Sequence, residues 1–327
     1  MAIIADKYYN LKDHAAQFGE NGLEAGVAEV LTQTNEIIDD ALMLESNLDS
    51  GHLYNVRTGI PEGTWRRLYQ GVEPVKATTK TVTEGYGELA AFSLVDKSLA
   101  EMGGMANVQK VRTAQSRGIL QGLSDQMAYN LIYGNNGITP ERFTGFAARY
   151  NTLSKKVESS KNVIDAKGTE DGNLSSIFLV VWGADKVFTF YPKGSKAGIE
   201  RVDYGLSIGE DGERKEYPAY KEFYMWKMGL AVPDWRYAGR IVNVPENPTK
   251  DLLDNMMDLE ERIQSLTSGK PVWYMNKRTK GALRRLLNEK ANVNYSSDKP
   301  TARPTLTFDE IPVHVCEAIS NTEGLIK

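Results

Sequence analysis

Residues 190–200, FYPKGSKAGIE, bring two glycines, two lysines and a serine together directly after an apolar run, and phosphate-binding loops use such residues. A Walker-type loop needs the pattern G-x-x-x-x-G-K-[ST], so that backbone N–H groups surround the phosphates where a helix begins. Here Gly194 and Gly198 are four positions apart, no lysine follows Gly198, and Pro192 interrupts the approach. Residues 199–213 then alternate and turn like a hairpin. The segment therefore predicts a turn between sheet elements and not a phosphate site.

Other residues that could do acid–base, nucleophilic or metal chemistry are few and scattered. The three histidines, His14, His52 and His314, lie far apart, with no HxxxH or CxxC spacing. The single cysteine, Cys316, cannot form an internal disulfide, which is typical of a reducing compartment, and is predicted to be a small buried residue on a strand. No Gly-x-Ser-x-Gly elbow is present, and GYG at 85–87 is too short for a dinucleotide fingerprint. We therefore predict no catalytic residue, no cofactor and no metal site.

An acidic run within 249–267 could be interpreted as a carboxylate site, because four-residue spacing places Asp254 and Asp258 on one helix face. Lys250 and Arg262 flank the run, and no histidine accompanies it. We therefore expect a solvated helix face, formed by Asp251, Asp254, Asp258, Glu260 and Glu261.

Length and charge narrow the class of protein. A chain of 327 residues can bury a large core and is expected to form two compact parts. A net charge of −4 argues against a protein that wraps nucleic acid by bulk electrostatics. No apolar run approaches the roughly 18 residues that cross a bilayer. Asp6 and Lys7 stand where a signal peptide would be apolar, so neither a membrane protein nor a secreted one is expected.

Residues 1–50 are strongly acidic, with ten carboxylates against two lysines, and the remaining residues sum to +4. Apolar residues recur there at three- and four-residue steps, which predicts one face of an amphipathic helix: Leu23, Val27, Val30, Leu31, Thr34, Ile38, Ala41 and Leu42. The helix could dock on its own domain or act as an arm on a neighbouring subunit, and the next segment favours the arm.

Residues 51–90 are rich in glycine and proline, and the alternation in 77–83 predicts strand. We expect a long two-stranded hairpin with Trp65, Arg66 and Arg67 on its outgoing arm. Such a hairpin is unstable alone and needs a surface, plausibly another copy of the chain. The two arginines could contact a nucleic-acid backbone. Pairing with acidic groups of a neighbouring subunit fits the charge segregation better.

The remaining elements follow from periodicity. We expect a short helix at 91–104 and a long helix at 106–133, where Gly118 and Gly122 suggest a bend or the close approach of another backbone. Beyond residue 150, strands and helices alternate around a central sheet, with 157–173 as a polar loop. The expected strands are 177–182, 223–232, 237–244, 272–275 and 312–319, and the expected helices are 249–267 and 276–290.

Six stretches, taken in order, resemble the major capsid proteins of tailed bacteriophages, especially the short-tailed type, with the Hong Kong 97-like capsid fold. They are TWRRLYQGVEPVKATTKTVTEGYGELAAFSLVDKSLAEMGG (64–104), LSDQMAYNLIYGNNGITPERFTGFAARYN (123–151), VWGADKVFTFYPKGSKAGIERVDYG (181–205), WKMGLAVPDWRYAGRIVNV (226–244), PVWYMNKRTKGALRRLL (271–287) and FDEIPVHVCEAI (308–319).

The resemblance implies a mixed α+β fold of four parts. Residues 1–50 would be an N-terminal arm, and 51–90 an extended hairpin loop lying across the adjacent subunit. Residues 91–150 would form a peripheral domain with a long spine helix. Residues 151–327 would form an α/β axial domain plus strands that return to the peripheral domain. The residues expected to contact another subunit are Gly59, Pro61, Gly63, Trp65, Arg66, Arg67, Lys76 and Lys80.

The function implied is structural. Many copies, arranged as pentamers and hexamers, would assemble in the host bacterial cytoplasm into the icosahedral head of the virion and enclose double-stranded DNA without sequence-specific binding. A portal, a separate scaffolding protein and cement or decoration proteins are the expected partners. Covalent cross-linking is not implied, because neither Lys76 nor Lys80 identifies an asparagine partner. An encapsulin-like cargo compartment and a soluble α/β enzyme are the alternatives, and DNA inside purified particles would distinguish a head from a compartment.

Overall fold

The computed structural model describes residues 35–59, 61–102, 104–154, 156–210, 213–289 and 306–327. Most of the predicted acidic helix lies outside these residues. Of its final part, only α2 (Ile37–Asp40) is helical, and β1 (Met43–Glu45) follows. Residues 41 and 42 leave the helix because β1 pairs with β7 (Phe188–Tyr191), Met43 lying opposite Thr189.

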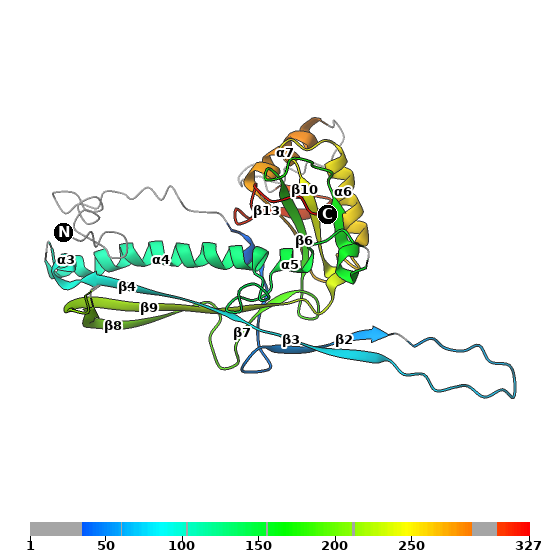
Figure 1. Cartoon of the computed structure of the whole chain (residues 1–327), viewed down its shortest axis with the longest axis horizontal. Coiled ribbons are helices and arrows are strands. Elements are labelled where there is room, and N and C mark those ends of the chain that lie inside the picture. The colour runs from blue at the N-terminus through cyan, green and yellow to red at the C-terminus, as the bar shows by residue number, and fades with distance from the viewer. Residues whose placement is uncertain (1–34, 60, 103, 155, 211–212, 290–305) are drawn as a thin grey trace.

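A long twisted sheet and one long helix form the first layer pair. In this sheet β9 (Glu216–Ala231) pairs with β4 (Gly87–Asp96) along one edge and with β7 and β8 (Ile199–Glu210) along the other. The helix α4 (Met105–Tyr133) runs along the sheet (Figure 1). It confirms the predicted long helix, with Val111, Leu123, Met127 and Leu131 buried.

The predicted helix at 91–104 is wrong in its first half. Residues 91–96 continue β4, whose register with β9 runs from Gly87 opposite Met228 to Asp96 opposite Ala219. Only α3 (Lys97–Ala100) is helical, and Asp96 Oδ1 caps it by accepting a hydrogen bond from Ser98 N at 2.7 Å. Long-range pairing with β9 therefore overrides the local helical preference.

A six-stranded sheet forms the second part of the molecule, and it confirms the predicted α/β core. Its strand order is β12-β13-β11-β6-β10-β5. All eight residues of β6 (Ser175–Trp182) are buried. Apolar side chains of α6 (Asp251–Arg262) and α7 (Lys277–Glu289) pack on one face, and α5 (Phe146–Arg149) packs on the other. The remaining strands are β10 (Ala238–Val244), β11 (Lys270–Met275), β12 (Thr307–Phe308) and β13 (Ile311–Val315), with the 3-10 turn η2 (Trp235–Tyr237) before β10.

The predicted polar loop at 157–173 contains regular structure. The 3-10 turn η1 (Glu158–Asn162) leads into β5 (Val163–Asp165), an edge strand parallel to β10. Val163 and Ile164 are buried, so two apolar residues within a polar stretch are enough to add a strand.

The hairpin and the turn from FYPKGSKAGIE both form as predicted. β2 (His52–Gly59) pairs antiparallel with β3 (Thr78–Glu84), His52 lying opposite Glu84. Residues 192–198 connect β7 to β8, and Gly194 and Gly198 have positive φ of 76° and 90° there. Between the hairpin strands the chain extends away from the body (Figure 1). Among the described helices, none is long and apolar enough to cross a membrane.

Candidate inter-subunit surfaces

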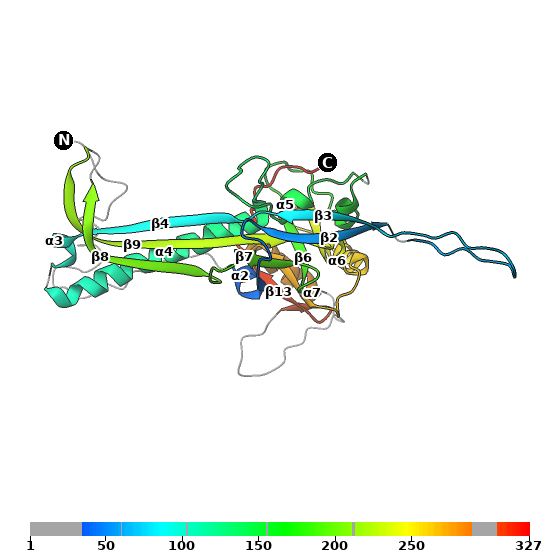
Figure 2. The same ribbon diagram turned by 90° about the horizontal axis from the view of Figure 1, so that it is seen from below.

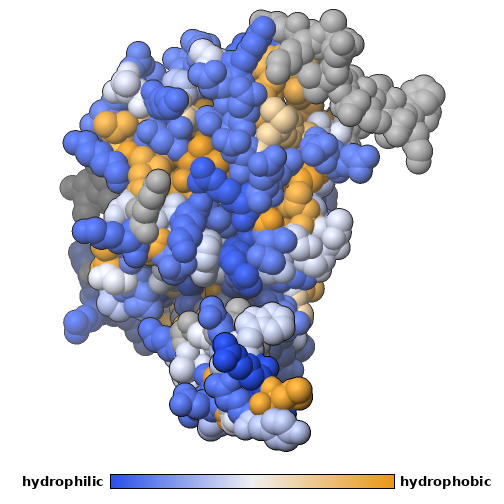
Figure 3. Space-filling view, turned by 90° about the vertical axis from the view of Figure 1, so that its right-hand side faces the viewer, coloured by the Kyte–Doolittle hydropathy of each residue, from blue (hydrophilic) through white to orange (hydrophobic). Residues whose placement is uncertain are grey.

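The extended loop, residues 61–77, connects β2 to β3 and contains no helix or strand. Every residue from 61 to 76 is exposed, and Trp65, Leu68 and Tyr69 are 100 %, 85 % and 103 % exposed. The loop projects toward the viewer at the bottom of Figure 3, with apolar side chains open at its surface. Six of the predicted contact residues lie on this loop, while Gly59 ends β2 and Lys80 lies on β3: Pro61, Gly63, Trp65, Arg66, Arg67 and Lys76.

The tip of the loop is a tight turn. Gln70 N donates a hydrogen bond to Arg67 O at 3.1 Å, and Arg67 N donates to Gln70 Oε1 at 3.4 Å. Tyr69 has a φ of 67° in this turn. A bulky side chain in the left-handed region costs about 1 kcal/mol, so glycine or asparagine would be the less strained choice. The turn thus holds an aromatic ring in open solvent at a cost in stability.

The base of the hairpin is fixed to the body by a buried ion pair. Both Arg149 terminal nitrogens donate to Glu84, at 2.8 and 2.9 Å, and Arg149 Nη2 also donates to Leu230 O at 3.2 Å. Tyr54 OH donates to Glu84 Oε1 at 2.9 Å, and burial together with the Glu84 charge raises the pKa of Tyr54. The tip therefore projects from a firmly anchored base.

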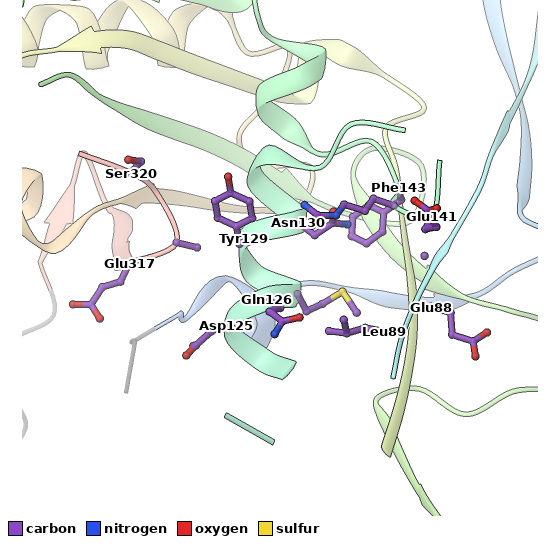
Figure 4. Close-up of a pocket in the computed structure, with 14 residues that line it drawn as sticks. Glu88, Leu89, Asp125, Gln126, Tyr129, Asn130, Glu141, Phe143, Glu317 and Ser320 are labelled. Atoms are coloured by element: carbon purple, nitrogen blue, oxygen red, sulfur yellow. The ribbon is translucent and has the colours of Figure 1, made fainter. Parts of the chain in front are cut away.

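A groove crosses the C-terminal half of α4, with a cavity volume of about 520 Å³. Leu89, Met127 and Phe143 line it with apolar surface. In Figure 4, Glu317 and Ser320 lie on one side of Tyr129, and Glu88, Glu141 and Phe143 on the other. Four carboxylates and one guanidinium line the groove, which gives it an acidic character: Glu88, Asp125, Glu141, Glu317 and Arg142.

The face of the long sheet opposite α4 also exposes apolar groups. The rings of Phe92 and Phe223 stack there with centroids 4.7 Å apart, and Phe92 is 57 % exposed. Lys221 Nζ lies 4.6 Å from the Phe92 ring centroid and 5.8 Å from that of Tyr204. Figure 2 views the molecule from below, where β4, β9 and β8 run side by side. We call this surface the open sheet face.

A charged cluster fastens α4 to the covered face of the same sheet. Arg112 Nη2 lies 2.5 Å from both Asp203 Oδ1 and Glu222 Oε1, and Arg201 Nη2 donates to Glu222 Oε1 at 2.8 Å. Burial raises the pKa of Glu222, but hydrogen bonds from Arg201 and Tyr224 and the Arg112 charge outweigh it and lower that pKa overall. Glu222 therefore stays ionised and joins helix to sheet.

The described part of the acidic segment lies on its own chain. Asp40 Oδ1 accepts from Lys270 Nζ at 2.6 Å, Asp40 Oδ2 accepts from Tyr274 OH at 3.1 Å, and His314 Nδ1 contacts the same carboxylate. Glu36 Oε2 accepts from Val315 N at 2.9 Å. For residues 35–45 docking on the parent domain is therefore correct, and the arm interpretation concerns residues outside the described chain.

Residues considered for chemistry occupy structural positions. Cys316 is buried just after β13, and burial raises the pKa of its thiol to about 12. Within the described residues no cluster of three or more histidine, cysteine or acidic side chains could hold a metal. The predicted solvated face of α6 is correct for its exposed members and wrong for Glu260, which is buried and accepts a hydrogen bond from Trp273 Nε1 at 3.2 Å. Burial raises the pKa of Glu260 to about 7. Its spacing of four from Met256 was the signal for this position.

Comparison with known proteins gives a consistent result. Residues 19–327 match the family model described as major capsid protein GP7. No curated protein matches the sequence. The structure is similar to that of bacteriophage epsilon15, with a TM-score of 0.79 and 29 % identity, covering 100 % of this chain and 99 % of that one. It also shares its fold with the capsid of bacteriophage JBD30, with a TM-score of 0.51 and 10 % identity, covering 89 % and 93 %. With the family model spanning all but the first 18 residues, this chain belongs to the family of phage major capsid proteins described as major capsid protein GP7.

Proposed function

We propose that this capsid protein forms the icosahedral head of a tailed bacteriophage from pentamers and hexamers of itself, and that the head encloses double-stranded DNA. The observation that carries the proposal is the extended loop. Its sixteen fully exposed residues have large apolar side chains and a rigid base. Burying one such side chain contributes about 1.5–3 kcal/mol, so contact with another subunit stabilises an assembly that the single chain cannot form.

The parts of the chain are proposed to divide the work of the shell. Residues 1–50 would include the N-terminal arm, and 51–90 the extended loop, although 87–90 belong to β4. Residues 91–150 would form a peripheral domain around α4 as its spine helix. Within 151–327 the six-stranded sheet would form the axial domain, and β8 and β9 would return to the peripheral domain. The pairing of β9 with β4 over ten residues supports that return.

Further partners follow from the requirements of such a head. A portal, a separate scaffolding protein and cement or decoration proteins would act with the shell, which would assemble in the bacterial cytoplasm and persist in the virion. The net charge of −4 supports containment of DNA without a tight grip, because tight binding depends on clustered lysine and arginine.

Electron microscopy of the purified protein, with portal and scaffold supplied, tests the proposal. We expect closed shells for the natural chain. We expect folded but unassembled subunits when residues 62–76 are replaced by a short glycine–serine turn. A wild-type protein that stays a monodisperse monomer in sedimentation under these conditions would contradict the proposal. Particles that package protein cargo and exclude DNA would favour the encapsulin-like alternative.

A further inference from the structure

The tip of the extended loop requires a surface with two properties. Trp65, Leu68 and Tyr69 are large apolar groups in open solvent, and they need an apolar hollow. Arg66 and Arg67 lie between them, and they need carboxylates nearby. Exposed apolar groups grouped in this way mark an interaction site.

The groove on α4 offers both properties. Its volume of about 520 Å³ is sufficient for a large aromatic side chain, and Leu89, Met127 and Phe143 line it. Glu88 is 47 % exposed at one end, where Lys227 Nζ lies 3.6 Å away, and Glu141 is exposed beside it. An extended segment could therefore lie across α4 with its rings inward and its cations toward the rim.

We propose that the tip of the extended loop, residues 65–69, binds in the groove on α4 of a second copy of this chain. Arg66 and Arg67 then face Glu88 and Glu141 at the acidic rim. The inference rests on the proposed function, in which the loop contacts a neighbouring subunit, and it assigns the surface that receives the loop.

A second copy is the occupant because the loop points away from its own groove. Each arm of about eight residues reaches roughly 25 Å beyond the strand ends at ~3.3 Å per residue. Figure 1 shows α4 and the loop extending from the body in opposite directions. The rigid base at Glu84 and Arg149 keeps that direction fixed.

Charge favours the groove over the open sheet face. On that face Lys221 lies over the rings of Phe92 and Tyr204, so an approaching Arg66–Arg67 pair would meet a like charge. Like charges brought together at an interface are unfavourable, whereas the groove presents carboxylates. The two apolar surfaces are similar in kind, and the sign of the charge distinguishes them.

The conformation of Tyr69 agrees with a contact role. Its φ of 67° is strained for a tyrosine, and the turn would be more stable with glycine there. Strained positions persist where the surroundings or a function require the residue. A ring held at the apex of the loop can enter a hollow that a backbone alone would not fill.

Thiol cross-linking in assembled shells tests the contact directly. The test variant carries Leu68→Cys on the loop and Gln126→Cys in the groove. The matched control carries Leu68→Cys and Lys110→Cys, an exposed position on α4 roughly 24 Å from residue 126 at 1.5 Å per residue. Native Cys316 is fully buried and does not compete. With a short bismaleimide we expect ladders of linked chains from the test variant and single chains from the control.

The outcomes separate this inference from the proposed function. Shells that give no ladder with Gln126→Cys, or a ladder only with Lys110→Cys, overturn the groove assignment while leaving the capsid function intact. Failure of the wild type to form any shell would instead overturn the proposed function.

Charge exchange gives a second readout if the cysteine variants do not fold. Arg67→Glu alone and Glu141→Arg alone should each slow assembly, by about tenfold if the contact loses ~1.4 kcal/mol. The two changes together should recover most of the wild-type rate, because the charges are then exchanged. A double variant no better than either single variant would contradict the proposed pairing.

Discussion

The central strand β6 and the extended loop are opposite extremes of one molecule. All eight residues of β6 are buried, whereas every residue from 61 to 76 is exposed, including a fully exposed tryptophan. Burial in the first region stabilises the single chain. Exposure in the second contributes nothing to that stability, so its apolar residues make sense only in contact with other molecules. Changes in the sheet should therefore act on folding, and changes in the loop should act on assembly.

Two tryptophans give the sharpest test of this contrast. Trp273, in β11 next to β6, is 0 % exposed, and Trp273→Ala should lower the free energy of unfolding by about 3–5 kcal/mol. Trp65→Ala should leave it within about 0.5 kcal/mol of wild type but reduce the yield of shells. Urea unfolding of the free subunits and light scattering of assembling ones measure the two effects. A large loss of subunit stability in Trp65→Ala would show that the loop supports its own fold.

The pH dependence of the core sharpens the comparison, because the loop lies far from any buried carboxyl. Burial raises the pKa of Glu260 to about 7 from an unfolded value near 4.5. The folded chain then holds the proton more tightly, so this contribution is complete below pH ~4.5 and is lost as pH rises to about 7. The loss is roughly 2–4 kcal/mol, at 1.36 kcal/mol for each pH unit.

Glu260→Gln should remove this dependence and make subunits relatively more stable above pH 7. The exposed Asp258→Asn on the same helix is the matched control and should change nothing. Thermal unfolding between pH 5 and 8 gives the answer. Parallel curves for wild type and Glu260→Gln would show that Glu260 is not protonated in the fold.

Periodic patterns made several elements predictable, because their residues repeat at a fixed step. The helix α4 and strands β6, β9, β10 and β11 all follow from local sequence. Residues 91–96 were misassigned because their strand depends on pairing with β9, some 120 residues away. Local sequence is a poor guide to such positions, since tertiary pairing decides them.

The candidate surfaces differ in the same way. Glycine, proline and the Trp-Arg-Arg sequence were enough to identify the extended loop. The groove was not predictable, because it combines residues 87–89, 125–130, 141–143 and 317–320, and only the fold brings these together. The buried position of Glu260 had a helical-spacing signal that its acidic neighbours obscured.

Two glycines of α4 test whether a second surface behaves like the loop. Sequence suggested a bend or a close backbone at Gly118 and Gly122, yet an added Cβ at either position meets nothing within 4 Å. Replacing both with alanine should therefore raise subunit stability by about 0.5–1 kcal/mol per site. Urea unfolding measures this gain. If assembly falls while stability rises, another molecule approaches the helix there; unchanged assembly would leave that face without a partner.

The smallest effect per contact is expected from the loop arginines. Arg66→Glu with Arg67→Glu should leave the circular dichroism spectrum unchanged, because neither side chain supports the fold. Each exposed ion pair contributes only about 0–1 kcal/mol, but every subunit interface repeats it, so the yield of shells should fall. Salt should weaken early wild-type assembly in the same direction, since screening shortens the reach of exposed charges to roughly 3 Å at 1 M. Light scattering across a salt series, for both proteins, measures the effect. Equal assembly at low salt would show that apolar contacts alone hold the loop, and the capsid assignment would stand without the electrostatic mechanism.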